Sequence, residues 1–316
     1  MVHPNGARTA NAISVYLADF FRTSGVQAPD WFNEFVAKPR VSRTIDVQGA
    51  PIHYDTWMSS AENPGLLFVH GNGAHSHWWD FIAPAFTNDF NVMAIDLSGA
   101  GDSGHREHYS AANFANEIIE VVRAAGFSRT IIAGHSFGGG MTRIAGYLYG
   151  DELGGIVLID SGISNRRGNR MPPTEPRPHT RFYESLEAAK KRFRLRPPQP
   201  CENDYILDYI AEYSIRETER GFRYKLDQSM FAKMTQDRNL DFPDAVSLIR
   251  AITCPVGFIY GEQSRFFEDA ESIETVKSVI PANLLHGIPN AHHHVFLDQP
   301  LAFIDTLREL LARLPG

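Results

Sequence analysis

The stretch that decides the fold is Ile131-Ile132-Ala133-Gly134-His135-Ser136-Phe137-Gly138-Gly139-Gly140, in which an apolar run leads directly into a glycine-rich turn. A helical pattern begins close behind it, near Met141. A tight turn between a strand and a helix strains the central residue, and only small neighbours such as Gly134 and Gly138 leave room for it. Such a turn holds the hydroxyl of Ser136 above the sheet, at a helix N-terminus that favours developing negative charge. The pattern indicates a nucleophilic serine, the alternative being a purely structural turn.

Short apolar runs recur on both sides of this stretch, and most are solidly apolar rather than alternating. Continuous apolar runs suit strands buried on both faces, as in a parallel sheet covered by helices. The runs lie at 41–48, 51–57, 65–70, 91–96, 129–134, 155–160, 255–260 and 284–288. Helical patterns lie at 77–86, 111–125, 138–149, 243–251, 268–279 and 298–314. This α/β alternation predicts a mostly parallel eight-stranded sheet flanked by helices, with the first two runs as an antiparallel hairpin at its edge.

One interval breaks the rhythm of strands and helices. Between Ser161 and about Asp241 the sequence holds proline-rich turns and helical, aromatic-rich pieces, and it contains no convincing strand. We expect a helical cap over 163–241, inserted into a core formed by 41–162 and 242–316, with an N-terminal helical extension over 1–40. We expect the substrate pocket to be lined by aromatic residues of the cap and of the core loop below it: Tyr209, Tyr213, Trp78 and Trp79.

The composition of the chain limits the kinds of partner and the location that we expect for the protein. The chain has 316 residues, 43% hydrophobic and 21% charged, as in an ordinary folded protein. Its formal net charge of −7 argues against a nucleic-acid partner, because phosphate binding needs a basic surface. Only Cys201 and Cys254 are present, which argues against a disulfide framework. We see neither a signal peptide nor a membrane span, and we therefore expect a cytoplasmic protein.

A second glycine-containing turn follows the apolar run at 65–70. The sequence His70-Gly71-Asn72-Gly73 lies two strands before the serine turn. In this arrangement the backbone N–H groups of Asn72 and Phe137 can form an oxyanion hole, which supplies two fixed donors to a tetrahedral intermediate. We expect His70 to brace the loop by hydrogen bonds rather than to transfer a proton.

These motifs resemble those of the α/β-hydrolase superfamily over almost all of 41–316. The resemblance rests on His-Gly-Asn-Gly after the third strand, Asp-Leu-Ser-Gly-Ala-Gly-Asp-Ser-Gly at 96–104, Gly-His-Ser-Phe-Gly-Gly at the serine, and a late histidine followed by Asp-Gln-Pro at 298–300. It implies that His293 is the base, with His292 and His294 as the alternatives if the register is off by one. Three adjacent histidines also suggest a metal site. No cysteine or carboxylate has the spacing to complete such a site, so we expect no metal.

The acid departs from the commonest pattern of the superfamily. After strand seven an Asp usually follows a Gly by three residues, whereas here Ser264 stands at that distance from Gly261. A minority of the superfamily instead places the acid after strand six, where this chain has Asp160. Certain bacterial esterases of that type pair this Asp with a serine after strand seven, and this chain resembles them. The alternative acids are Glu262, Glu268 and Asp269.

The resemblance implies a serine hydrolase that cleaves carboxyl esters of small, largely apolar molecules without a cofactor. The same triad can act on carbon–carbon bonds, lactones, amides or thioesters, and the fold can also serve as a non-catalytic ligand receptor. A homodimer contact through the N-terminal helices is a further possibility. The stretch Arg166–Arg196 holds ten Lys or Arg against three Glu. It is either a solvated surface or a region that attracts anionic substrates or a membrane surface.

Overall fold

A computed structural model describes residues 27–163, 180–234 and 242–314 and contains the central sheet expected from the sequence. The strands are β1 (Val41–Val47), β2 (Ala50–Trp57), β3 (Gly65–Val69), β4 (Asn91–Ile95), β5 (Ile131–His135), β6 (Gly155–Ile159), β9 (Val256–Gly261) and β10 (Leu285–Ile288). Their order in the sheet is β1-β2-β4-β3-β5-β6-β9-β10. The pairs β1–β2 and β2–β4 are antiparallel and the others are parallel, so the predicted edge hairpin and mostly parallel sheet are confirmed.

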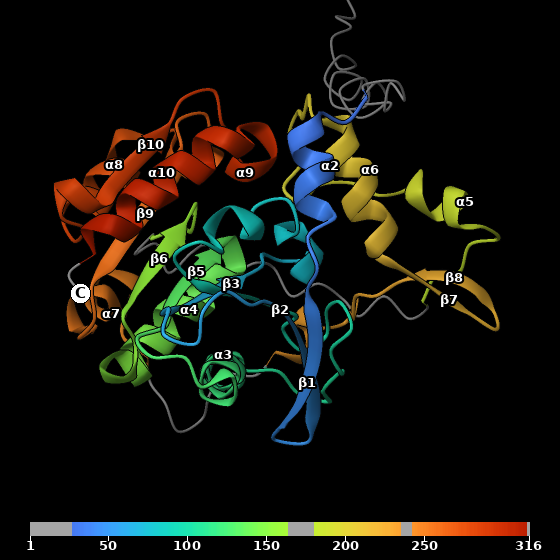
Figure 1. The fold of residues 1–316 in the computed structure, drawn as a ribbon, viewed down its shortest axis with the longest axis horizontal. Coiled ribbons are helices and arrows are strands. Elements are labelled where there is room, and N and C mark those ends of the chain that lie inside the picture. Colours follow the sequence, from blue (N-terminus) through green and yellow to red (C-terminus); the bar gives the residue numbers. More distant parts are fainter. Residues whose placement is uncertain (1–26, 164–179, 235–241, 315–316) are drawn as a thin grey trace, which may run out of the picture.

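Helices cover both faces of this sheet, and α3 and α10 lie on opposite sides of it (Figure 1). The helices of the core are α3 (Ala111–Ala125), α4 (Ser136–Tyr149), α7 (Ala245–Ala251), α8 (Ala270–Lys277), α9 (Val295–Asp298) and α10 (Pro300–Arg313). Every residue of β3, β4, β5 and β6 is buried, which is why these runs are continuously apolar. The helix α3 is capped by the Ser110 hydroxyl, which accepts a bond from the Asn113 amide, and by Gly126 at a φ of 71°.

The helix predicted at 77–86 is wrong as a single element. The chain forms two 3₁₀ turns instead, η1 (Ser76–Trp79) and η2 (Ala83–Phe86). Pro84 lies in the first turn of η2, where its missing N–H cannot continue a helix from the preceding residues. Further 3₁₀ turns are η3 (Gly150–Glu152), η4 (Phe231–Lys233), η5 (Arg265–Phe267) and η6 (Ala282–Leu284).

The described part of the N-terminal extension is the helix α2 (Asp30–Val36). Its buried Phe32 contacts the rings of Phe81, Tyr205 and Tyr209 at centroid distances of 5.7, 5.0 and 5.6 Å. The helix therefore lies between the core and α6 (Asp204–Tyr213) (Figure 1). Residues 1–26 of the predicted N-terminal extension lie outside the described residues.

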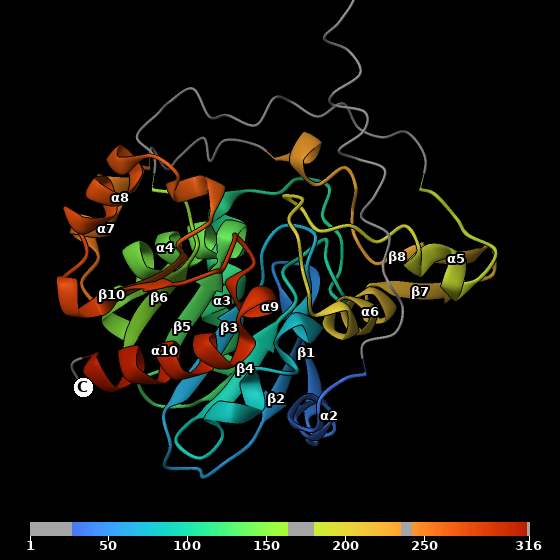
Figure 2. The ribbon, with the colours of Figure 1, turned by 90° about the horizontal axis from the view of Figure 1, so that it is seen from above.

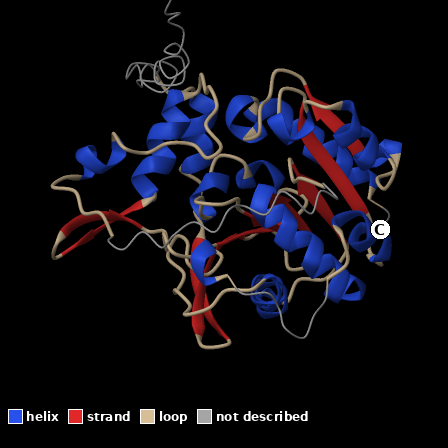
Figure 3. Cartoon of the chain, turned by 180° about the vertical axis from the view of Figure 1, so that it is seen from behind, coloured by secondary structure: helices blue, strands red, loops and turns tan. Residues whose placement is uncertain are grey.

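The segment 180–234, between β6 and β9, projects from the side of the molecule opposite α8 and α10 (Figures 1 and 2). It contains α5 (Leu186–Lys190), α6 and a separate hairpin of β7 (Ile215–Thr218) and β8 (Gly221–Tyr224) (Figure 3). The prediction that this interval holds no strand is therefore wrong. Each of these strands has four residues, which is too short for an alternating pattern to be recognised.

No helix in the described ranges combines the length and the apolar character that crossing a bilayer requires.

Candidate active site

Ser136 occupies the sharp turn at which β5 ends and α4 begins. Its φ of 53° lies in the left-handed region, a strained conformation for a residue with a side chain. The turn closes because its neighbours are small: a Cβ on Gly138 would collide with the backbone carbonyl of His70, and one on Gly134 would collide with the Thr142 hydroxyl. The Ser161 hydroxyl donates a hydrogen bond of 3.0 Å to the Ser136 carbonyl. The small residues around Ser136 therefore allow the sharp turn that holds its side chain in this position.

His293 lies in the loop between β10 and α9, and its imidazole reaches the serine. The distance from His293 Nε2 to Ser136 Oγ is 2.8 Å. The imidazole is only 2% exposed, so this hydrogen bond is shielded from water. The adjacent His292 bonds to Asp298 instead, at 3.0 Å, and no hydrogen bond joins it to Ser136. Of the three successive histidines, His293 is the one that the structure brings to the serine.

Asp160 follows β6 and contacts the opposite side of the His293 ring. His293 Nδ1 donates to Asp160 Oδ1 at 2.7 Å, and the Ser264 hydroxyl donates to the same oxygen at 2.7 Å. The Gly261 amide donates to Asp160 Oδ2 at 2.8 Å. The carboxylate is fully buried, and three donors from two other strand ends hold it in place. The sequence-predicted residues Ser136, His293, Asp160 and Ser264 therefore form one hydrogen-bonded chain.

The alternative acids lie away from the imidazole. Asp269 caps α8 by accepting a bond of 2.7 Å from the Ser272 amide. Glu262 and Glu268 are exposed on the surface. The carboxylate that the structure brings to His293 is the one after strand six.

Burial shifts the pKa of Asp160 and the pKa of His293 in opposite directions. Burial raises the pKa of Asp160 to about 7, although the hydrogen bonds from Ser264 and Gly261 act to lower it. Burial lowers the pKa of His293 to about 4, because a charged imidazole is poorly solvated there. At neutral pH the imidazole is thus neutral, which is the form that can accept a proton.

The turn after β3 passes directly beside Ser136. A Cβ built on Gly71 would lie 3.2 Å from Ser136 Cβ, so only glycine lets the turn approach this closely. His70 holds the turn: its Nδ1 donates to the Gly71 carbonyl at 2.8 Å, and its Nε2 accepts from the Leu97 amide at 3.1 Å. Asn72 follows immediately, and Phe137 occupies the first turn of α4, where amides have no partner within the helix.

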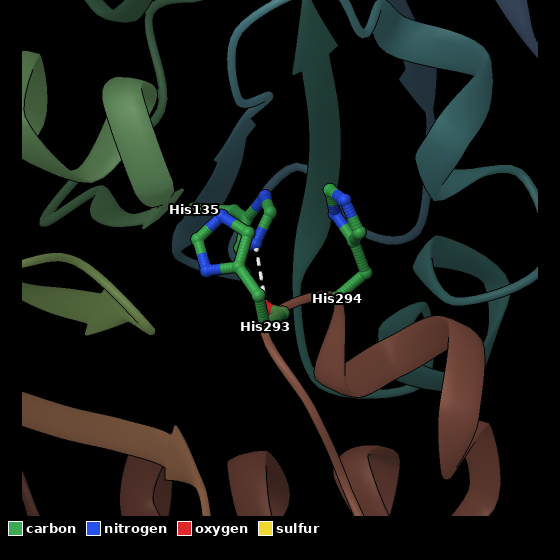
Figure 4. A group of neighbouring side chains, drawn as sticks. All are labelled: His135, His293 and His294. Carbon is green, nitrogen blue, oxygen red and sulfur yellow. Dashed lines mark hydrogen bonds between the residues drawn. The ribbon is translucent and has the colours of Figure 1, made fainter. Parts of the chain in front are cut away.

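Sequence reasoning did not single out His135, the residue before the serine. Figure 4 shows its ring beside those of His293 and His294, with a hydrogen bond of 3.0 Å from His135 Nε2 to the His293 carbonyl. This bond fixes the backbone of the base, and burial lowers the pKa of His135 to about 3. A residue in the variable position of Gly-x-Ser-x-Gly carries no sequence signal for such a role.

The same three histidines offer nitrogens that lie within 4.8 Å of one another. Zinc bonds to histidine at about 2.0–2.1 Å, so a tetrahedral site needs nitrogens much closer than this limit. Both nitrogens of His293 are already engaged, by Ser136 and Asp160. A metal at this cluster therefore requires the hydrogen-bonded chain to break.

A cavity of about 550 Å³ lies between the turn at Asn72 and the segment 180–234. Of the predicted pocket residues, Trp78 lines it. The lining of this cavity does not include the other predicted pocket residues, Trp79, Tyr209 and Tyr213, which pack elsewhere. Trp79 stacks on Phe68 in the core at 4.7 Å. The Tyr209 hydroxyl donates to Asp80 at 2.6 Å, and the Tyr213 ring lies 4.0 Å from that of His77.

The sheet order, the helices on both faces and a serine at the β5–α4 turn define an α/β-hydrolase fold. The sequence model of the alpha/beta hydrolase family matches residues 66–306, and the chain belongs to this family.

Similar proteins support hydrolase activity. The chain is 25% identical over 303 residues to the esterase Rv0045c of Mycobacterium tuberculosis (strain ATCC 25618 / H37Rv), covering 93% of this chain and 94% of that protein. It is 24% identical over 279 residues to a serine hydrolase-like protein of Danio rerio, covering 81% and 83%. The crystal structure of an E-2-(acetamidomethylene)succinate hydrolase matches with a TM-score of 0.70 at 21% identity, over 87% of this chain and 100% of that chain. This structural likeness shows the fold.

Proposed function

We propose that the protein is a serine hydrolase that cleaves carboxyl esters through an acyl-enzyme. The observation that carries the proposal is the buried chain of hydrogen bonds from Ser136 Oγ to His293 and from His293 to Asp160, at 2.8 and 2.7 Å. A nucleophile within reach of a base, which a third group orients, is the arrangement that nucleophilic catalysis needs.

In the first step His293 Nε2 accepts the proton of Ser136 as Oγ attacks the carbonyl carbon of the ester. Asp160 accepts the hydrogen bond from Nδ1–H, which keeps the imidazole in the required tautomer and stabilises the imidazolium. The oxyanion is bound by the amides of Asn72 and Phe137. His293 then gives its proton to the leaving alcohol, and the acyl-enzyme remains.

Water completes the cycle by the same route. His293 takes a proton from a water molecule that attacks the acyl carbon, and it returns the proton to Ser136 Oγ as the acid leaves. The protein's own residues handle every proton, and the scheme uses no cofactor.

Carboxyl esters are our choice of substrate for two reasons. The esterase relative covers nearly the whole chain at 25% identity. The cavity next to Asn72 also has apolar walls, among them Trp78, Phe193 and Met230, that suit the hydrocarbon part of an ester. We also propose a cytoplasmic location, which fits the two free cysteines, Cys201 and Cys254.

Steady-state hydrolysis of p-nitrophenyl butyrate tests the proposal. Ser136→Ala and His293→Ala should each reduce kcat by about 10⁴-fold or more. Ser247→Ala, which removes an exposed hydroxyl on α7, serves as the matched control and should leave kcat unchanged. Activity near that of the wild type in Ser136→Ala would overturn the proposal. An enzyme that hydrolyses no ester and whose Ser136 does not react with acylating reagents would indicate the receptor alternative.

A further inference from the structure

The cavity beside Asn72 carries a charge opposite to that of the chain. Five cationic side chains line it against one carboxylate, that of Asp227, whereas the chain as a whole has a formal net charge of −7. The cationic residues are Arg181, Arg192, Arg194, Arg196 and Lys225. Clustered charge of one sign around a cavity raises the local concentration of ligands of the other sign.

Three of these arginines come from one short run, Arg192-Phe193-Arg194-Leu195-Arg196. Burial alternates along it: Phe193 and Leu195 are 8% and 7% exposed, whereas the three arginines are exposed. The apolar residues thus anchor the run, and Arg192, Arg194 and Arg196 all line the cavity. An exposed arginine is ordinarily just solvated, but here three of them share one wall.

The arginines of this run keep their donors available. Among the described residues no carboxylate forms an ion pair with Arg192, Arg194 or Arg196. Arg194 Nη1 donates to the backbone carbonyls of Lys191 and Phe193. Two other charged groups of the cavity, Lys225 and Asp227, are already paired. Lys225 Nζ lies 2.7 Å from Asp102, and Asp227 accepts bonds of 2.8 Å from both Tyr109 and Lys233. Guanidinium groups with free donors bind carboxylate or phosphate well.

The cavity also reaches the residues next to the nucleophile. Asn72 lines it and follows Gly71, the residue in close approach to Ser136. Phe231 lines it as well, and its ring packs edge-on against Phe137 at 5.7 Å. A molecule in the cavity therefore lies against Asn72 and against Phe231, the residue that packs on the Phe137 ring.

We propose that this cavity selects esters that carry an anionic group, a carboxylate or a phosphate, which Arg192, Arg194 and Arg196 bind while the ester lies at Ser136. This inference rests on the proposed esterase function. The apolar residues Trp78 and Phe193 in the same cavity receive the hydrocarbon that separates the anionic group from the ester.

Paired substrates test the inference. On the acyl side, p-nitrophenyl hydrogen glutarate is compared with p-nitrophenyl hexanoate; on the alcohol side, 4-acetoxyphenyl phosphate is compared with phenyl acetate. In at least one pair we expect kcat/KM to be about tenfold or more higher for the anionic ester, as for a charge-assisted contact. The advantage should shrink as salt is raised, because ions screen exposed charges. The pair in which the anionic ester is preferred distinguishes a carboxylate on the acyl group from a phosphate on the alcohol.

The arginines are then tested directly. In the double variant Arg192→Gln/Arg196→Gln the anionic advantage should fall to about twofold or less, while kcat/KM for the neutral ester stays within about twofold and so reports intact folding. Arg192→Lys should retain part of the advantage, since it keeps the charge. Arg250→Gln, an exposed arginine on α7, is the matched control and should change neither rate.

Two results overturn the inference while the proposed function stands. One is a wild-type enzyme that hydrolyses the neutral esters and shows no anionic preference in either pair; the other is a preference that survives in the double variant. A wild-type enzyme that hydrolyses none of the four esters contradicts the proposed function itself.

Discussion

Asp160→Asn removes the charge that the structure places against the base while almost preserving the shape of the side chain. The wild-type carboxylate accepts three hydrogen bonds, two at Oδ1 from His293 and Ser264 and one at Oδ2 from the Gly261 amide. Asparagine offers only one acceptor oxygen. Its amide group must therefore face a donor on one side or the other.

Either orientation damages the site. If the asparagine NH₂ faces Gly261, two donors oppose each other in a buried position. If it faces His293, it stabilises the tautomer with the proton on Nε2, which cannot take the proton of Ser136. The charge that stabilises the imidazolium is lost in both cases. We expect kcat to fall by about 10³- to 10⁴-fold, which corresponds to about 4–5.5 kcal/mol in activation free energy.

The assay is kcat for p-nitrophenyl butyrate, with thermal melts to confirm folding. Glu262→Gln is the matched control. It also removes a carboxylate, directly after β9, but this carboxylate is exposed, and the hydrogen bonds of the His293 ring go to Asp160 and Ser136. It should keep kcat within about threefold. Near-normal turnover in Asp160→Asn together with collapse in Glu262→Gln would refute the assignment of the acid.

Three further predictions concern the same site. Ser264→Ala removes a donor to Asp160 and should lower kcat by about ten- to hundredfold, as steady-state kinetics will show; an unchanged rate would mean that Ser264 does not position the carboxylate. Activity should be present above a pKa of about 7 and be lost as pH falls through it, because Asp160 and His293 share one hydrogen bond and take up the first proton as a unit. In Asp160→Asn the acid limb of kcat/KM should move down towards 4, the pKa of the buried imidazole alone; a limb that does not move would contradict this. Gly138→Ala should destabilise the fold by about 1–3 kcal/mol, because its Cβ would strike the rigid backbone at His70; an unchanged melting temperature would show that the turn can relax.

The sheet could be predicted from the sequence because its inner strands are buried on both faces. Runs such as Leu66–Val69 and Ile156–Ile159 are therefore continuously apolar and stand out from their surroundings. The turn at Ser136 could be predicted for a related reason, since a strained conformation needs glycines at fixed positions. The local sequence determines these features.

Features that depend on contacts between distant residues could not be predicted in the same way. The hairpin β7–β8 has strands of four residues, too short to show a period. Tyr209 has the aromatic side chain expected of a pocket residue. Its hydroxyl nevertheless donates to Asp80, and its ring packs on Phe32 of the N-terminal helix. The basic stretch 166–196 was noted from its charge, but only the structure shows that Arg192 and Arg196 share a cavity next to Asn72.

Covalent labelling with a fluorophosphonate, followed by peptide mapping, tests the central claim most directly. The reagent mimics the tetrahedral intermediate and reacts only with a serine that a base activates. We expect a single modification, on Ser136, with labelling strongly slowed in His293→Ala and absent in Ser136→Ala. Modification of a different serine, or no modification of the folded wild-type protein, would contradict the account.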